Sequence, residues 1–126
     1  DIFPDNVFFT DGRLSAVIDF YFSCTDFYAF DLAVTVNAWC LGREDRFDPD
    51  RCRAFMAGYQ AVRPLLDAEK QALQILHRGS AFRTLISRLE EFHEHDPENT
   101  MMLPHDPAAY LKRLYFHQEF DVASFA

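Results

Sequence analysis

Three oxygen-bearing side chains near the start of the chain have residue types and a spacing that suit phosphoryl transfer. Asp1 precedes Asn6 by five positions, and a second carboxylate, Asp19, follows a predicted hairpin. Carboxamide and carboxylate oxygens are hard ligands, which suit Mg²⁺ better than zinc, and Mg²⁺ keeps positions open for phosphate oxygens. Asp1 lies outside the hairpin and could accept a proton from an attacking hydroxyl. These residues therefore predict one base and two metal ligands of a phosphoryl-transfer site.

A predicted β-hairpin over residues 7–20 must bring these groups together. Asp11-Gly12 lies between two runs of β-branched and aromatic residues, which is typical of a type I′ turn because both central positions need positive φ. The register expected from this turn pairs Thr10 with Arg13, Phe9 with Leu14, Phe8 with Ser15, Val7 with Ala16, and Asn6 with Val17. Asn6 and Asp19 then become diagonal neighbours on one face, about 7 Å apart. The other face is predicted to pack on the core, through Val7, Phe9, Leu14, Ala16, Ile18 and Phe20.

Helices are predicted for most of the remaining chain. Residues 30–41 are apolar almost all round, which predicts a helix buried on most sides, with Gly42 at its C-terminal end. Asp48-Pro49 places an N-cap before a proline at the first helical position, so a second helix is expected to run to about Val62. Asp106-Pro107 repeats this signal before the last helix, whose core side is expected to hold Tyr110, Leu111, Leu114 and Tyr115.

Between these helices, apolar positions with helical spacing predict a long helix from about 72 to 92. Asp67 is a candidate N-cap, and Gly79-Ser80 is a candidate kink. The predicted fold class is therefore α+β, mainly α. We expect a single domain over residues 1–126, with the hairpin packed on a helical body.

Composition excludes several classes of protein. Twelve Lys and Arg against twenty Asp and Glu give a formal charge of −8, which argues against a general nucleic-acid binder. No apolar run approaches the ~18 residues of a membrane span. Three cysteines without a CxxC motif favour a reducing, cytoplasmic setting over a zinc or disulfide framework. The chain starts without an initiator Met, which we interpret as a sign that it could belong to a longer gene product.

The motif of Asp1 to Asn6 resembles the catalytic loop of the aminoglycoside-phosphotransferase-like and protein-kinase-like superfamily, and Asp19 resembles its metal-binding aspartate. Within that superfamily the chain is similar to the homoserine kinase branch almost from end to end. The stretches that carry this resemblance are DIFPDNVFF, LSAVIDFYFSCTD, YAFDLAVTVNAWC, GYQAVRPL and YLKRLYFHQ. The histidine usually found two positions before the catalytic aspartate is not in this sequence, nor is the nucleotide-anchoring lysine of an N-terminal lobe.

The resemblance implies the C-terminal lobe of an enzyme that uses ATP and Mg²⁺ to convert homoserine to O-phosphohomoserine in threonine biosynthesis. It implies Asp1 as the catalytic base, Asn6 and Asp19 as metal ligands, and Asp31 as a structural support of the catalytic loop. Its partners would be ATP, a small amino alcohol and the protein's own N-terminal lobe, without nucleic acid or membrane. Because homoserine carries a carboxylate, a cation is also needed, and Arg83 is the candidate among the arginines of the long helix. This chain alone is expected to be inactive.

Two alternatives stay open at this point. A kinase of the same superfamily could act on choline, an aminoglycoside or another amino alcohol, which the acidic composition would suit. The chain could instead be a non-catalytic helical interaction module derived from a kinase lobe.

The remaining polar residues are expected to have structural roles. We interpret residues 90–96 as a solvated helix end, and Asp5 and Asp26 as loop caps or as supports behind the site. The three cysteines are expected to be small buried residues, and His77, His105 and His117 to be isolated, on the surface or satisfied in the core.

Overall fold

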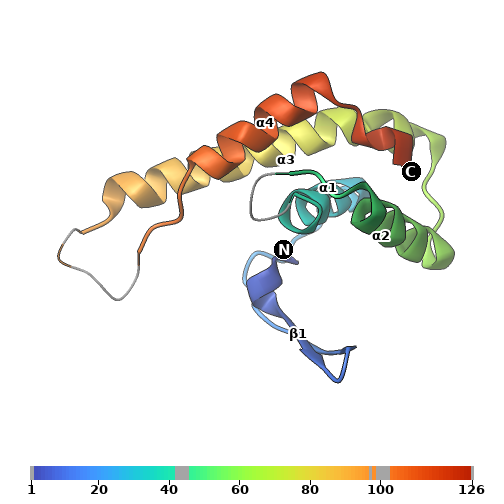
Figure 1. Ribbon diagram of the computed structural model, residues 1–126, viewed down its shortest axis with the longest axis horizontal. Helices are drawn as coiled ribbons and strands as arrows, with labels where there is room; N and C mark the ends of the chain where they lie inside the picture. The colour runs from blue at the N-terminus through green and yellow to red at the C-terminus, as the bar shows by residue number, and fades with distance from the viewer. Residues whose placement is uncertain (1, 42–45, 97, 99–102, 126) are drawn as a thin grey trace.

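The computed structural model describes residues 2–41, 46–96, 98 and 103–125, and it is mainly helical with one small antiparallel hairpin. A 3₁₀ turn, η1 (Pro4–Asn6), leads into strands β1 (Val7–Thr10) and β2 (Arg13–Val17). Four helices and a last 3₁₀ turn follow: α1 (Tyr28–Trp39), α2 (Pro49–Val62), α3 (Asp67–Glu94), α4 (Ala108–Glu119) and η2 (Val122–Phe125). In Figure 1, α3 and α4 run side by side, and α1 crosses beside α3. No helix in the described ranges is both long and apolar enough to cross a membrane.

The hairpin turns at Asp11 and Gly12, which both have positive φ, as predicted. Thr10 pairs with Arg13 and Phe9 with Leu14, also as predicted, but Phe8 pairs with Ala16 and Val7 with Val17. A β-bulge therefore places Ser15 as an extra residue on β2, and the predicted register is wrong from Phe8 onward. A shift of one residue moves side chains to the opposite face, because successive residues of a strand alternate between faces.

The hairpin projects away from the helices, so the predicted packing on the helical body is wrong for its outer part (Figure 1). Phe9 and Leu14, which were expected in the core, are 58% and 61% exposed. Trp39 of α1 contacts both the hairpin and the segment that precedes it. Its indole nitrogen donates a 2.6 Å hydrogen bond to the carbonyl of Ile2, and its ring contacts Phe9 edge-on at 6.4 Å.

The start of α2 agrees with the sequence signal, whereas α4 begins one residue later than predicted, at Ala108 with Pro107 as its N-cap, and α3 also differs. α2 begins at Pro49 after the N-cap Asp48, whose carboxylate accepts a 2.9 Å hydrogen bond from the backbone N–H of Arg51. α3 is uninterrupted from Asp67 to Glu94, so the predicted kink at Gly79-Ser80 is absent. Asp67 is inside this helix instead of being its N-cap.

The start of α3 is instead satisfied by Glu69, whose carboxylate accepts a hydrogen bond from the backbone N–H of Leu66. The same carboxylate forms a 2.8 Å salt bridge with Arg63 at the end of α2, and this pairing lowers the pKa of Glu69. Because one side chain bonds to both helix ends, the connection between α2 and α3 is held at a fixed angle.

On α4, Tyr110 and His117 are buried, whereas Leu111 and Tyr115 are exposed. The predicted core side of α4 is therefore only half right, because the buried stripe runs through Tyr110, Leu114 and His117 instead. The helix predicted over residues 30–41 corresponds to α1, which ends two residues earlier, at Trp39 with Cys40 as its C-cap. Gly42, the residue predicted at its C-terminal end, lies outside the described residues.

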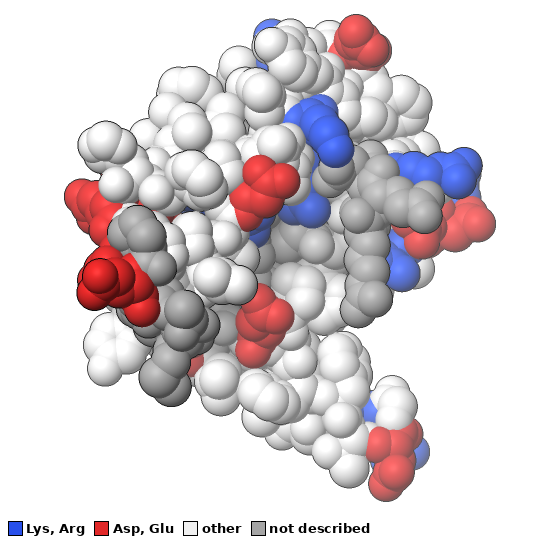
Figure 2. All heavy atoms as spheres, turned by 60° about the vertical axis from the view of Figure 1, so that its left-hand side comes forward, with Lys and Arg blue, Asp and Glu red and all other residues white. Residues whose placement is uncertain are grey.

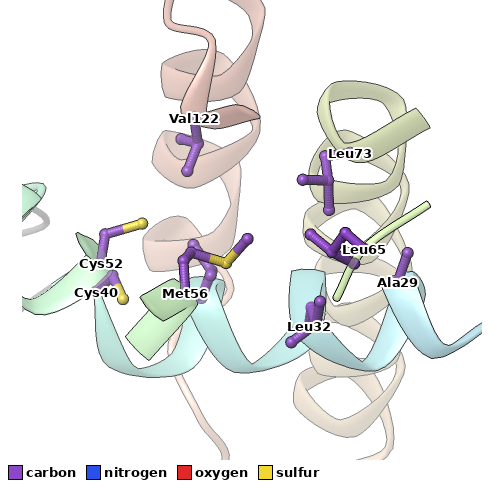
Figure 3. Close-up of a cluster of buried hydrophobic side chains, with 9 residues drawn as sticks. Ala29, Leu32, Cys40, Cys52, Met56, Leu65, Leu73 and Val122 are labelled. Carbon is purple, nitrogen blue, oxygen red and sulfur yellow. The ribbon is translucent and has the colours of Figure 1, made fainter. Parts of the chain in front are cut away.

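The main hydrophobic core joins α1, α2, α3 and η2 (Figure 3). Its buried members are Ala29, Leu32, Val36, Cys40, Cys52, Met56, Leu65, Leu73 and Val122. Cys40 and Cys52 are fully buried, as predicted, and a hydrogen bond to Cys52 together with burial raises the pKa of the Cys40 thiol. Cys24 is exposed, contrary to the prediction for all three cysteines.

One buried amide, Asn37 of α1, connects three helices. Its Nδ2 donates to the carbonyl of His77 at 3.0 Å and to Oγ of Ser80 at 3.3 Å, both on α3. Its Oδ1 lies 2.7 Å from Nε2 of His117 on α4, which must be the donor because the amide oxygen is an acceptor. The rings of His77 and His117 stack at 5.2 Å, so the two histidines are not isolated.

Both histidines are held neutral by this environment. Burial lowers the pKa of His77 to about 4. Burial, with smaller contributions from His77 and Arg113, lowers the pKa of His117 to about 3. The unfolded chain, with histidine pKa values near 6.5, binds more protons than the folded chain below that pH. Stability is therefore fully present above about pH 6.5 and is lost as the pH falls towards 4.

We expect His77→Phe to reduce this pH dependence while leaving stability at pH 7.5 within about 1 kcal/mol of the parent. The ring nitrogens of His77 have no hydrogen-bond partner in the described part of the chain, so phenylalanine can retain the stacking without losing a bond. Urea unfolding at pH 7.5 and pH 5 measures both effects. The exposed His93→Gln is the control and should retain the full dependence; an equal dependence in His77→Phe would contradict this account.

Candidate active site

The N-terminal segment, η1 and the end of β2 hold the predicted catalytic and metal-binding residues. Asp1 lies outside the described residues. Asn6 is the last residue of η1, is half-buried, and its carbonyl accepts a 3.0 Å hydrogen bond from the N–H of Ile18. Asp19 follows Ile18 directly and is exposed. A backbone hydrogen bond thus joins the two segments that carry Asn6 and Asp19 at the open end of the hairpin.

The bulge changes the reason for expecting Asn6 and Asp19 on one face. Asn6 is opposite Ile18 instead of Val17, so a regular strand would direct Asp19 to the other face. Asp19 does not continue the strand, however, because its φ is +61°. Left-handed backbone is costly for residues other than Gly, Asn and Asp, and such positions gather at functional sites. The proximity of the two side chains therefore stays a prediction, and the register argument for it is replaced by this backbone turn.

A cavity of about 440 Å³ lies between η1 and the facing sides of α3 and α4. Asn6 lines it together with Asp5, which adds a carboxylate to the Asn6 carboxamide at this end. The opposite side of the cavity, called the basic wall below, is formed by α3 and α4. It carries three arginines, Arg83, Arg88 and Arg113, and the hydroxyl groups of Thr84 and Ser87. Figure 2 shows one face of the molecule, on which Lys and Arg side chains lie near the centre and Asp and Glu side chains lie around them.

Tyr110 forms the centre of the basic wall. The guanidinium carbons of Arg88 and Arg113 lie 4.5 Å and 4.4 Å from the centroid of its ring, which is cation–π geometry. Tyr110 is 1% exposed. Burial raises the pKa of its hydroxyl, and the nearby Arg113 and Arg88 oppose this in part.

Two polar atoms of this wall are buried without a hydrogen bond to any described residue: the Tyr110 hydroxyl and Nε of Arg113. Arg113 and Thr84 lie close enough to the hydroxyl to influence its pKa, but neither makes a bond of normal geometry with it. An unsatisfied buried donor costs about 1–3 kcal/mol. The wall therefore has unused capacity to bind an acceptor.

Arg83 is exposed on α3 and lines a second cavity as well, of about 710 Å³. This second cavity lies between residues 20–28 and α1, and it also contains Ile2, Asp26 and Asp31. Asp31 is exposed, not buried as its place in an apolar helix suggested. The Asp26 carboxylate accepts a 2.7 Å hydrogen bond from the N–H of Phe27, which agrees with its predicted capping role.

Sequence reasoning missed the basic wall. Arg113 was not considered, and Tyr110 was assigned to the core alone. The available signal was the spacing of three residues between Tyr110 and Arg113, which places both on one side of a helix. The sequence does not indicate which arginines of α3 face them, because that depends on how α3 packs against α4.

The acidic and histidine-rich end of α3 is exposed, as predicted for a solvated helix end. A carboxylate oxygen of Glu91 lies 3.2 Å from Nδ1 of His105, within hydrogen-bond distance, and both side chains are about half exposed. No group of three His, Cys, Asp or Glu side chains within the described ranges could hold a metal ion. A metal ion held by Asn6 and Asp19 would have one asparagine ligand, a residue type outside these four, and would need further ligands besides these two side chains.

Comparison with known proteins gives a consistent result. The profile of the phosphotransferase enzyme family (APH) matches residues 1–65, a segment that includes Asp1, Asn6, Asp19 and Asp31. The chain is 52% identical over 118 residues to a protein of Gluconacetobacter diazotrophicus named homoserine kinase, and 51% identical over 123 residues to one of Xanthobacter autotrophicus with the same name. A homoserine kinase of Rhodospirillum rubrum is 49% identical over 118 residues.

These alignments cover 94%, 98% and 94% of this chain, but only 36%, 38% and 36% of the respective relatives. The chain thus spans little more than a third of the length of these relatives.

We expect the left-handed backbone at Asp19 to be visible in stability measurements. Asp19→Ala should lower the free energy of unfolding by about 1 kcal/mol, because a Cβ without a polar group disfavours positive φ. Asp19→Gly should be neutral or slightly stabilising, since glycine accepts this conformation. Chemical denaturation of both variants gives the comparison. Asp26→Ala and Asp26→Gly form the control pair, since Asp26 has no positive φ; the same difference between alanine and glycine there would remove the argument for Asp19.

Proposed function

Since this chain belongs to the phosphotransferase enzyme family, we propose that it is the catalytic and substrate-binding part of a homoserine kinase. The reaction would transfer the γ-phosphoryl group of ATP to the hydroxyl of L-homoserine, giving O-phospho-L-homoserine and ADP in threonine biosynthesis. One observation carries this proposal: about half of the residues are identical to those of proteins named homoserine kinase, over 94–98% of the chain. Use of ATP agrees with the cytoplasmic setting predicted from the cysteines.

The fold proposed for this part is the C-terminal lobe of a protein-kinase-like enzyme. The mainly helical body with a small hairpin supports this proposal. Large apolar side chains are exposed between the hairpin and α1, with Tyr21 94%, Phe22 69% and Phe27 76% exposed. We propose that the protein's own N-terminal lobe covers this surface and completes the nucleotide site, so that the 126 residues alone are inactive.

In the proposed mechanism Asp1 orients the substrate hydroxyl and accepts its proton as the oxygen attacks the γ-phosphorus. The bond between that phosphorus and the bridging oxygen breaks, and ADP leaves with the electron pair. Asn6 and Asp19 would hold Mg²⁺, which neutralises phosphate charge when bound. Their side-chain oxygens are suitable ligands for this ion. The hydrogen bond between the Asn6 carbonyl and the Ile18 N–H joins the two segments that carry these residues.

Two further residues complete the proposed site. Asp31 would support the catalytic loop, since it lines the same cavity as Ile2, the neighbour of Asp1. Arg83 would contact the substrate carboxylate, because it lines both cavities and therefore lies between the N-terminal segment and the basic wall.

The direct test is a phosphoryl-transfer assay of the complete gene product with L-homoserine, choline, an aminoglycoside and other amino alcohols. We expect L-homoserine to have the highest kcat/KM. A higher value for choline or an aminoglycoside would assign a different kinase of the superfamily. No transfer to any of these alcohols would support the non-catalytic interaction module.

The roles of the two carboxylates can be separated by their response to Mg²⁺. Asp1→Asn should lower kcat by about 10²–10⁴-fold with nearly unchanged nucleotide binding, because it removes the proton acceptor and keeps the shape. Asp19→Asn should weaken Mg²⁺-dependent nucleotide binding as well as turnover.

Raised Mg²⁺ should partly rescue Asp19→Asn and leave Asp1→Asn unchanged. Rates across a Mg²⁺ series measure this, with Asp11→Asn in the hairpin turn as the matched control. Equal rescue of both variants would show that the roles are assigned incorrectly.

A further inference from the structure

The basic wall of the 440 Å³ cavity holds more positive charge than the described residues around it neutralise. Three arginines line the cavity, against Asp5 and Glu91. Glu91 is paired with His105. Arg88 and Arg113 form no salt bridge with a described carboxylate; each donates only a long hydrogen bond of 3.4 Å, to the carbonyls of Asp106 and Leu41 respectively. Glu91 and Asp106 act on Arg88 only through their charge, without a salt bridge, so the two neighbouring arginines are available to an external anion.

The geometry of the wall also indicates how an anion would be held. The ring of Tyr110 keeps both guanidinium groups within 4.5 Å of its centroid. The Tyr110 hydroxyl and Nε of Arg113 are buried donors without a partner among the described residues, and both residues line the cavity. A carboxylate has two oxygens that accept such bonds side by side, and charge-assisted bonds of this kind are the strong ones.

We propose that Arg113 and Tyr110 bind the carboxylate of the substrate, with Arg88 as a positioning residue that holds the Tyr110 ring. This inference rests on the proposed function and adds the element that determines its specificity. Arg83, proposed above as a contact of the same carboxylate, is exposed, whereas Tyr110 is fully buried and Arg113 is half-buried, so Tyr110 and Arg113 make the discriminating contact. The wall selects alcohols that carry a carboxylate, because a cationic alcohol without one leaves Arg113 unpaired and adds like charge.

A phosphate oxygen has the same acceptor chemistry, so the test must separate the two sources. We assign the carboxylate, because the proposed ligands of Mg²⁺, which would place the phosphates, are Asn6 in η1 and Asp19 after β2 and do not belong to α3 or α4. The probes are L-homoserine, 3-amino-1-propanol, which is homoserine without its carboxylate, and inorganic phosphate.

The experiment measures binding of each probe to the complete gene product by calorimetry, together with KM for L-homoserine and for ATP. Arg113→Lys should weaken L-homoserine binding by about 10- to 100-fold, because lysine cannot reproduce the planar donor geometry. Tyr110→Phe, which retains the ring, should weaken it by about 5-fold. In both variants KM for ATP and the weak binding of 3-amino-1-propanol should be unchanged.

Arg78→Lys is the matched control, since Arg78 is on α3 but lines neither cavity, and it should bind all probes like the parent protein. Thermal unfolding of each variant identifies a loss caused by misfolding, and in that case Tyr110→Phe, the smaller change, decides.

Three results would overturn the proposal. The first is unchanged L-homoserine binding in Arg113→Lys, and the second is equal binding of L-homoserine and 3-amino-1-propanol to the parent protein. The third is a raised KM for ATP or loss of inorganic phosphate binding without loss of L-homoserine binding, which would assign the wall to phosphate. If L-homoserine binds as expected but is not phosphorylated, the proposed function fails while the carboxylate site stands.

Discussion

The hydrogen bonds of Asn37 are the constraint on which the arrangement of the helical body depends. The donors and the acceptor of a buried amide must form hydrogen bonds, because each one left without a partner lowers the free energy of unfolding and apolar neighbours cannot replace the lost bond. Asn37 does so only if α3 presents the His77 carbonyl and Ser80 while α4 presents His117. A sliding of either helix by one residue would break these bonds. Apolar packing brings the three helices together, and the amide specifies their register.

That register has consequences two turns farther along the same helices. Tyr110 lies two turns before His117 on α4, and Arg88 lies two turns beyond Ser80 on α3. The network that pairs His117 and Ser80 with Asn37 therefore also aligns Tyr110 with the arginines of the cavity wall. Arg113 connects the two regions directly, because its charge contributes to the lowered pKa of His117 while its guanidinium contacts the Tyr110 ring. The packing of α3 against α4 thus positions both the buried polar residues around Asn37 and the residues of the candidate substrate pocket.

The hairpin is attached differently, and the difference fits its role. Its strands are mostly exposed, and Trp39 of α1 contacts the ring of Phe9 in β1 and the carbonyl of Ile2, which precedes the hairpin. The part that must be placed accurately, η1 with Asn6, forms the wall of the cavity, whereas the outer turn at Asp11 and Gly12 projects away. The bulge at Ser15 lies in the middle of β2, and the left-handed backbone at Asp19 directly follows Ile18, which is hydrogen-bonded to Asn6. Irregular backbone of this kind re-aims side chains that a regular strand would direct elsewhere.

Local signals in the sequence determined the elements, because their physical causes are local. Asp48-Pro49 specified the start of α2, and Asp11-Gly12 specified the turn of the hairpin. The apolar run of residues 30–41 specified the buried helix α1 to within two residues at each end. The motif of Asp1, Asn6 and Asp19 also indicated the class of chemistry. Tertiary structure alone decided the rest. No glycine or other residue type typical of a bulge occurs at Ser15, so the sequence does not predict this bulge. The face of α4 that is buried depends on how α4 packs against α3. The wall of Arg88, Tyr110 and Arg113 unites residues 22 to 25 positions apart in the chain, and only the packing fixed by Asn37 brings them together.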